Sequence, residues 1–232
     1  MLHIPISEKV EGFYKSLENN APLLPNGFRF INPYNSNDKA WEIVNKFYQM
    51  FYNDNKKRRM ILGSSPARRG SAVTGVPFED AEHLNHITGV SIVGFQISKA
   101  SSDFLYDVME QYGGCNAFYA NFYMSFVCPL GIVKRKSTIR EVNCNYYETA
   151  TLVKAVTPFI VDSLKKQLSF GFDTSVCYCI GSGENFRFLS KLNEEHEFFR
   201  AIVPLEHPRY IMQYNPKQRA FFLDKYLNAL QQ

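Results

Sequence analysis

Four short apolar runs alternate with helical patterns, and this alternation limits the possible folds more than any other feature of the chain. The runs have the length and composition of buried strands and are residues 60–62, 122–127, 175–180 and 201–205. Helical periodicity covers about 7–20, 38–53, 80–87, 101–112, 147–170, 184–196 and 217–231. Strands that alternate with helices form parallel sheets covered on both faces. We therefore predict an α/β fold, a three-layer sandwich with a central, mostly parallel four-stranded sheet flanked by helices.

The size of the chain fits one domain with a full core. It has 232 residues, of which 45% are hydrophobic and 15% aromatic, and this apolar content argues against disorder. We expect residues 1–232 to form a single domain, to which residues 1–37 contribute an N-terminal helix and an extended connector rich in Pro and Asn. The charged run at residues 56–59 is expected to be a solvated turn before the first strand.

Composition also bounds the partners and the compartment. The net charge of +4 permits a polyanionic partner, although a strongly basic arm is absent. Five cysteines without a CxxC pair are expected to be reduced thiols in a cytoplasmic protein that needs no metal and no cofactor. The sequence shows neither a signal peptide nor an apolar stretch long enough to span a membrane. We expect a monomer.

Two polar loops follow the first and the last of the predicted strands. Residues 63–70 read Gly-Ser-Ser-Pro-Ala-Arg-Arg-Gly, and residues 207–209 read His-Pro-Arg. Ligands of open parallel sheets bind outside the carboxyl ends of the strands, so both loops could face one pocket. Small residues, backbone amides, two arginines and an imidazole suit an anionic ligand or leaving group.

Each loop also has an ordinary structural explanation when it is considered alone. Residues 63–70 lack the Gly-Lys-Ser/Thr ending of a phosphate loop and could be a simple turn. A single histidine is often a satisfied structural residue, and Pro208 restricts the backbone of His207 in any case. Gly-Ser-Gly at 181–183 lacks the further glycine of a dinucleotide fingerprint and is expected to be a turn.

Taken together, the motifs resemble the uracil-DNA glycosylase superfamily, and most closely its single-strand-selective monofunctional branch with its bacterial relatives. That branch begins its first motif with Gly-(Met/Ile)-Asn-Pro-Gly and later reaches Thr-Gly-Val-Pro-Phe; it also has a Cys-Pro-Leu strand end and a His-Pro motif. The matching residues follow the family's order and are Gly63, Pro66, Gly70, 74–78, 128–130 and 207–208. The resemblance covers roughly residues 40–230.

This resemblance implies a DNA-repair glycosylase that flips a damaged base out of single- or double-stranded DNA and hydrolyses its N-glycosidic bond. It implies that His207 and Ser65 are catalytic, the first stabilising the leaving base as an anion and the second holding water. The base-binding residues implied are Gly63, Ser64, Phe78, Ser125 and Phe126. The DNA-binding residues implied are Pro66, Arg68, Arg69, Pro208, Arg209 and Tyr210. The motifs contain no lysine for a Schiff base, which favours a monofunctional enzyme.

Two departures from the family pattern leave alternatives open. Ser65 replaces the asparagine that orients the attacking water, although some branches with a Gly-x-x-Pro-Ala opening carry an apolar residue there. The base-reading asparagine falls at Phe126, or at Ser125 if the register shifts by one. A catalytically impaired nucleic-acid-binding member, or a small-anion-binding α/β protein, would account for the same motifs. A flat aromatic slot beside a basic groove favours DNA, whereas a closed cavity favours a small ligand.

Overall fold

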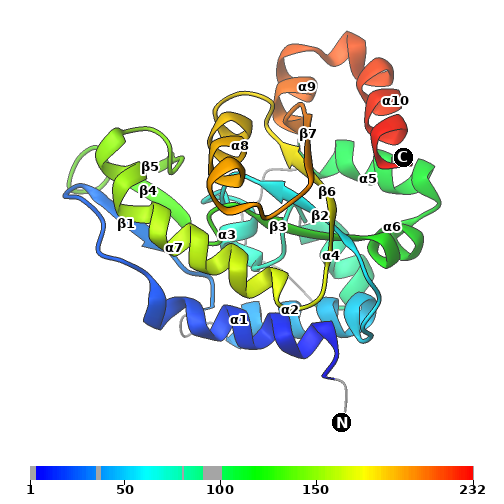
Figure 1. Cartoon of the computed structure of the whole chain (residues 1–232), viewed down its shortest axis with the longest axis horizontal. Coiled ribbons are helices and arrows are strands. Elements are labelled where there is room, and N and C mark those ends of the chain that lie inside the picture. The colour runs from blue at the N-terminus through cyan, green and yellow to red at the C-terminus, as the bar shows by residue number, and fades with distance from the viewer. Residues whose placement is uncertain (1–3, 35–37, 80, 91–100, 232) are drawn as a thin grey trace.

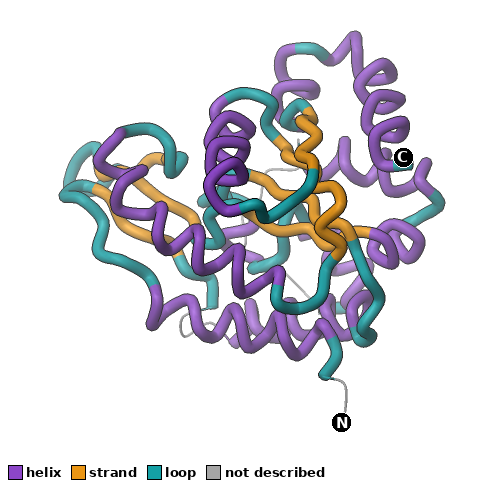
Figure 2. Tube along the Cα trace, in the orientation of Figure 1, coloured by secondary structure: helices purple, strands orange, loops and turns teal. Residues whose placement is uncertain are grey.

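The central sheet of the computed structural model, which describes residues 4–34, 38–79, 81–90 and 101–231, confirms the predicted fold. Its four strands are parallel in the order β3-β2-β6-β7, as Figures 1 and 2 show. They are β2 (Arg59–Gly63), β3 (Phe122–Phe126), β6 (Asp173–Ile180) and β7 (Ala201–Leu205). All five residues of β3 are buried, as expected for a strand covered on both faces.

Helices cover the two faces of this sheet. In Figure 1, α7 (Ala150–Leu168) and α8 (Glu184–His196) lie on the near side, whereas α2 (Asp38–Tyr52) and α4 (Ala81–Thr88) lie on the far side. The other helices are α1 (Ile6–Asn20), α3 (Ser71–Thr74), α5 (Ser102–Tyr112), α6 (Cys115–Asn121), α9 (Pro208–Tyr214), a 3₁₀ turn (Pro216–Gln218) and α10 (Arg219–Leu230). None of the helices in the described part of the chain has the length and apolarity needed to cross a membrane.

A second, smaller sheet was not predicted. It is antiparallel in the order β1-β4-β5, with β1 (Phe28–Ile31), β4 (Gly131–Arg135) and β5 (Glu141–Cys144). The segment 21–37 is therefore more than a connector, since β1 lies within it, although residues 35–37 are outside the described part. Sequence patterns missed β1 because its partner β4 is distant in the chain and Pro and Asn residues flank it.

The charged run at 56–59 is only partly the solvated turn that was expected. Lys56 and Lys57 are exposed, but the Arg58 side chain is buried, with 1% of its surface accessible. Its guanidinium donates to an Asp54 carboxylate oxygen at 2.6 Å and to the Tyr119 carbonyl at 2.6 Å. A buried charge is tolerated when it is paired and its donors are satisfied in this way.

Candidate functional site

Both polar loops border one cavity at the carboxyl end of the parallel sheet, as their positions predicted. The cavity has a volume of about 640 Å³ and is lined by Ser64 and Ser65, which follow β2, and by His207, which follows β7. Phe78 and Phe126 contribute aromatic rings to its wall. The cavity thus combines hydroxyl groups, an imidazole and flat apolar surface.

Most of the residues singled out in the sequence lie at this cavity. Its lining includes Ser64, Ser65, Arg69, Phe78, Phe126, His207, Arg209 and Tyr210. Pro66 and Ser125 instead line a separate crevice of about 10 Å³. Gly63 lies directly behind the two aromatic rings, whereas Arg68 and Pro208 flank the lining residues in sequence without belonging to the lining.

His207 is held as a neutral hydrogen-bond donor. It caps the N-terminus of α9, where its Nδ1 accepts a hydrogen bond from the Arg209 backbone N–H at 3.1 Å. Burial, and secondarily the charge of Arg209, lower the pKa of His207 to about 4. A neutral ring whose Nδ1 is an acceptor carries its proton on Nε2. His207 can therefore donate to an anion without being charged itself.

We expect the imidazole of His207 to titrate far below the usual histidine range. Because its pKa in the folded state is lowered to about 4, the ring stays neutral as pH falls from 7 towards 5. Replacing Arg209 with Gln should raise this pKa but leave it below 6.5, since burial is the larger cause. NMR titration of the His207 ring protons in both proteins measures this, and a wild-type midpoint at or above 6.5 would contradict it.

The aromatic wall depends on a glycine and on a strained backbone. The rings of Phe78 and Phe126 stack with centroids 5.2 Å apart and planes at 29°. A Cβ on Gly63 would lie 2.4 Å from Phe78 Cζ and 3.0 Å from Phe126 Cδ1, so a side chain there requires the rings to shift. Phe78 has a φ of +62°, and its N–H donates to Ser71 Oγ at 2.9 Å. Such a backbone costs roughly 1–3 kcal/mol and is typical of functional sites.

Ser65, which replaces the first asparagine of the family, and Ser125, which replaces the second only if the register shifts by one, behave differently. The strand register pairs Gly63 with Phe126 and Leu62 with Ser125, which leaves Phe126 at the cavity. Ser125 Oγ donates to Gln167 Oε1 at 2.6 Å within the core. By contrast, Ser65 Oγ is buried and makes no hydrogen bond with any described residue. Ser65 therefore lines the cavity with a hydroxyl that has no partner in the described part of the chain.

Several cavity residues were not identified from the sequence. Asn143, Asn145 and Tyr147 come from β5 and the turn after it, and Asn145 Oδ1 accepts from Ser64 Oγ at 3.4 Å. These three residues could not be placed at the cavity from the sequence because β5 itself was not predicted. Burial raises the pKa of Tyr147, which keeps its hydroxyl protonated. Tyr214 lines the cavity one helical turn after Tyr210, and this spacing could have revealed it.

A buried carboxylate also reaches the cavity wall. Glu79 follows Phe78 and is 2% exposed. The hydroxyls of Tyr106 and Tyr119 both donate to it, which fixes the carboxylate in place. Across the described residues, no three His, Cys, Asp or Glu side chains gather closely enough to hold a metal ion.

Comparison with known proteins agrees with the motifs. A model of the uracil DNA glycosylase superfamily matches residues 49–231. The chain is similar to wild-type SMUG2 of Pedobacter heparinus, whose crystal structure it matches with a TM-score of 0.93 and 41% sequence identity. That match covers 100% of this chain and 98% of the other. No curated protein sequence matches the chain.

Proposed function

Because the chain belongs to the uracil-DNA glycosylase superfamily, we propose that it is a monofunctional DNA glycosylase that excises uracil or another deaminated base. The observation that supports this most strongly is the cavity in which a neutral His207 and the Ser64–Ser65 loop share an aromatic wall. A flat base fits such a wall, and an imidazole donor suits the negative charge that the base acquires as it leaves.

Each of three cavity residues has a separate role in the proposed hydrolysis. Water adds its oxygen to C1′ of the sugar, and the base leaves with the electron pair of the broken C1′–N bond. The attacking water gives up one proton to solvent, and the released base anion takes up a proton from solvent, which leaves free base and an abasic site. His207 Nε2–H stabilises that pair as it moves onto the base, and Phe78 lies against the base. Ser65 Oγ, which has no hydrogen-bond partner among the described residues, positions the water. The charge of His207 does not change during the reaction.

The choice of base is proposed to depend on polar side chains that act in place of the family's base-reading asparagine, whose position Phe126 occupies. The Phe126 ring offers shape but no hydrogen bond to a base edge. Asn145 and Tyr147 line the same cavity, and the protonated Tyr147 hydroxyl can donate to a carbonyl of the base. We assign base reading to these two side chains, with Gly63 and Ser64 completing the wall behind them.

DNA is the partner proposed for this cavity. Arg69, Arg209 and Tyr210 lie at its lining, and all three are exposed. Arginines at this edge would bind phosphates, and an exposed aromatic ring would stack in the gap left by the flipped base. The protein is proposed to act as a monomer in the cytoplasm, a compartment in which its five free thiols are stable.

Changes at Ser65 test the assignment of the water. We expect Ser65→Ala to slow base release by less than about tenfold, because neighbouring amides remain and water can partly occupy the space. We expect Ser65→Asn to maintain or raise activity on uracil, since an amide offers both a donor and an acceptor with longer reach. Single-turnover formation of abasic sites measures both, and a faster Ser65→Ala than wild type would contradict the assignment.

The proposed activity itself is tested with oligonucleotides that carry uracil, hypoxanthine or xanthine. We expect free base and abasic sites in equal amounts, with the strand intact until alkali is added, from at least one of them. DNA binding without base release from any would favour a non-catalytic nucleic-acid-binding protein. Failure to bind single or double strands would favour the small-anion-binding alternative.

A further inference from the structure

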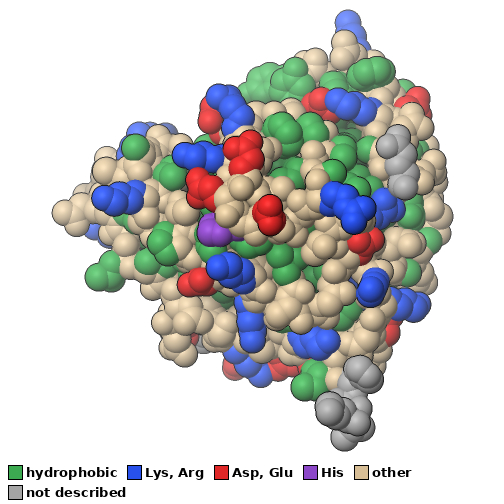
Figure 3. Space-filling model, in the orientation of Figure 1, with side chains coloured by type: hydrophobic (Ala, Val, Ile, Leu, Met, Phe, Trp, Pro, Cys, Tyr) green, Lys and Arg blue, Asp and Glu red, His purple; other side chains and the backbone are tan. Residues whose placement is uncertain are grey.

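The hairpin formed by β4 and β5 carries an unbalanced set of positive charges. Lys134, Arg135, Lys136 and Arg140 lie on it, and the last three are exposed. None of the four has an ion pair with a described residue. The one carboxylate of this hairpin, Glu141, is paired with Arg29 of β1, whose Nε donates to it at 2.7 Å. In Figure 3, blue side chains lie at the left of the molecule, where Figure 1 places β4 and β5.

The turn of the hairpin brings like charges together. The Lys136 N–H donates to the Arg140 carbonyl at 2.8 Å, so these two cationic residues face each other across the turn. Like charges in such a position destabilise a hairpin, and a bound polyanion would remove that cost. Ile139 between them is 97% exposed, which leaves an apolar tip beside the charges.

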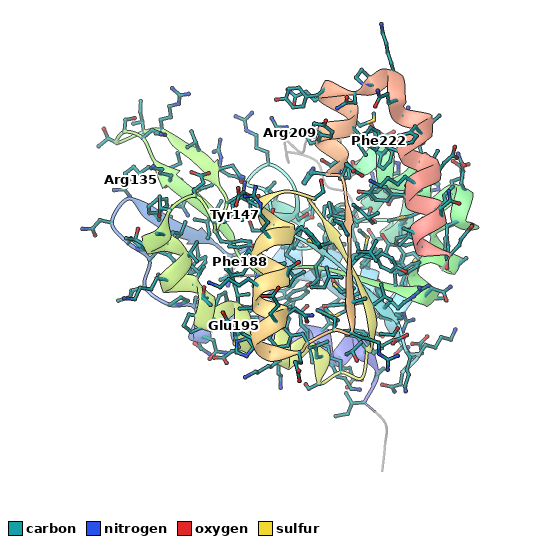
Figure 4. All side chains as sticks on the ribbon, turned by 45° about the horizontal axis from the view of Figure 1, so that its top comes forward. Arg135, Tyr147, Phe188, Glu195, Arg209 and Phe222 are labelled. Carbon is teal, nitrogen blue, oxygen red and sulfur yellow. The ribbon has the colours of Figure 1, made fainter. Side chains whose placement is uncertain are left out.

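The hairpin is continuous with the cavity. Asn143 and Asn145, at and beyond the end of β5, line the cavity, and Asn143 Oδ1 accepts from the Arg68 N–H at 2.9 Å. In Figure 4, Tyr147 lies between Arg135 on the hairpin and Arg209 on α9. Arg140 is three residues from Asn143, which places it roughly 10 Å further along the strand. With the bases stacked as in a duplex, a DNA strand advances about 3.4 Å per nucleotide, so this distance corresponds to about three stacked nucleotides.

We propose that the β4–β5 hairpin is a second DNA-binding element, which holds phosphates of the damaged strand about three nucleotides from the flipped base. The assignment rests on the proposed function, because the strand is placed by the base in the cavity. Arg135, Lys136 and Arg140 contact phosphates, and Ile139 packs on a sugar or a base. The hairpin acts on affinity and leaves the chemistry in the cavity unchanged.

The test compares two variants that each remove three positive charges. The first is Arg135→Gln/Lys136→Gln/Arg140→Gln. The control is Lys57→Gln/Lys165→Gln/Lys166→Gln, whose lysines are exposed near the start of β2 and the end of α7, at the opposite end of the sheet. Fluorescence anisotropy with an undamaged single strand at several salt concentrations gives the affinity. The slope of log K against log salt should become shallower by about 2 in the hairpin variant, at about 0.7 for each phosphate that is no longer neutralised.

The same proteins also test the DNA binding of the hairpin independently of the glycosylase activity. We expect the control to keep a slope close to that of wild type, and the hairpin variant to release base at the wild-type rate when DNA is saturating. Two further oligonucleotides keep only one nucleotide on the 5′ side or only one on the 3′ side of the uracil. Wild-type protein should bind one of these two more weakly than the full-length oligonucleotide. The hairpin variant should show no such loss. Equal slopes in the two variants would overturn the assignment. Wild-type protein that binds DNA through the hairpin but releases no base would refute the glycosylase and leave only the DNA binding by the hairpin standing.

Discussion

Replacing His207 with alanine is expected to slow base release by about 10²–10³-fold, the usual effect of removing one donor to a developing anion. The expectation follows from the state of the imidazole. Its Nδ1 is occupied by the Arg209 N–H, and its lowered pKa keeps the ring neutral, so Nε2–H is free to face the departing base. Because this interaction forms only as the bond breaks, the rate should fall while DNA affinity stays nearly constant. Single-turnover rates at saturating enzyme, with a separate binding titration, measure the two effects.

His196→Ala is the matched control for this experiment. His196 is exposed at the end of α8 and does not line the cavity. We expect its variant to release base at the wild-type rate. Equal rates for wild type and His207→Ala would remove His207 from the mechanism, and a parallel loss of DNA affinity would show that His207 binds substrate rather than the leaving group.

Substituting Gly63 with alanine is expected to lower base release by about 10²-fold, because a displacement of about 1 Å at an active site can have that effect. The added Cβ would lie 2.4 Å from Phe78 Cζ, so the ring has to move into the space that the base would occupy. Phe78 cannot adjust freely, since its backbone is fixed at a positive φ by Ser71. The circular dichroism spectrum should remain that of a folded protein.

The chain offers a second glycine as a control for Gly63. Gly183 also lines the cavity, but a Cβ built there meets no atom within 4 Å. Gly183→Ala should therefore keep nearly all of its activity. A Gly63→Ala protein as active as Gly183→Ala would show that the contact between Gly63 and Phe78 does not shape the site.

The central sheet was predictable because its signal is local. Each of its four strands is a short apolar run between helical patterns, and parallel strands buried on both faces give such runs without alternation. The small sheet was not predictable in this way. Its strand β1 pairs Phe28 with Lys134, a contact between distant segments that no local pattern encodes. Arg58 was misjudged for a similar reason, since its burial depends on partners in α6 and after α2.

The site was predictable only in part. Residues that follow the predicted parallel strands could be placed at it, whereas residues near the small sheet could not. Ser65 and His207 could be placed at one pocket because both follow parallel strands. Asn145 and Tyr147 reach that pocket from the end of β5, and they were missed together with that strand. Sequence alone also left the register open between Ser125 and Phe126. The pairing of Gly63 with Phe126 decides which of them borders the cavity, and pairing between strands is a property of the fold.

We propose that the cavity between the two loops holds the flipped base. It is tested most directly by a crystal structure of the protein with a single-stranded oligonucleotide containing 2′-fluoro-2′-deoxyuridine, whose fluorine disfavours the cation-like sugar and so slows cleavage. We predict that the uracil lies in the cavity against Phe78, with a carbonyl oxygen roughly 2.7–3.2 Å from His207 Nε2. A uracil bound outside the cavity, or one in the cavity beyond hydrogen-bond reach of His207, would rule out this role for the cavity.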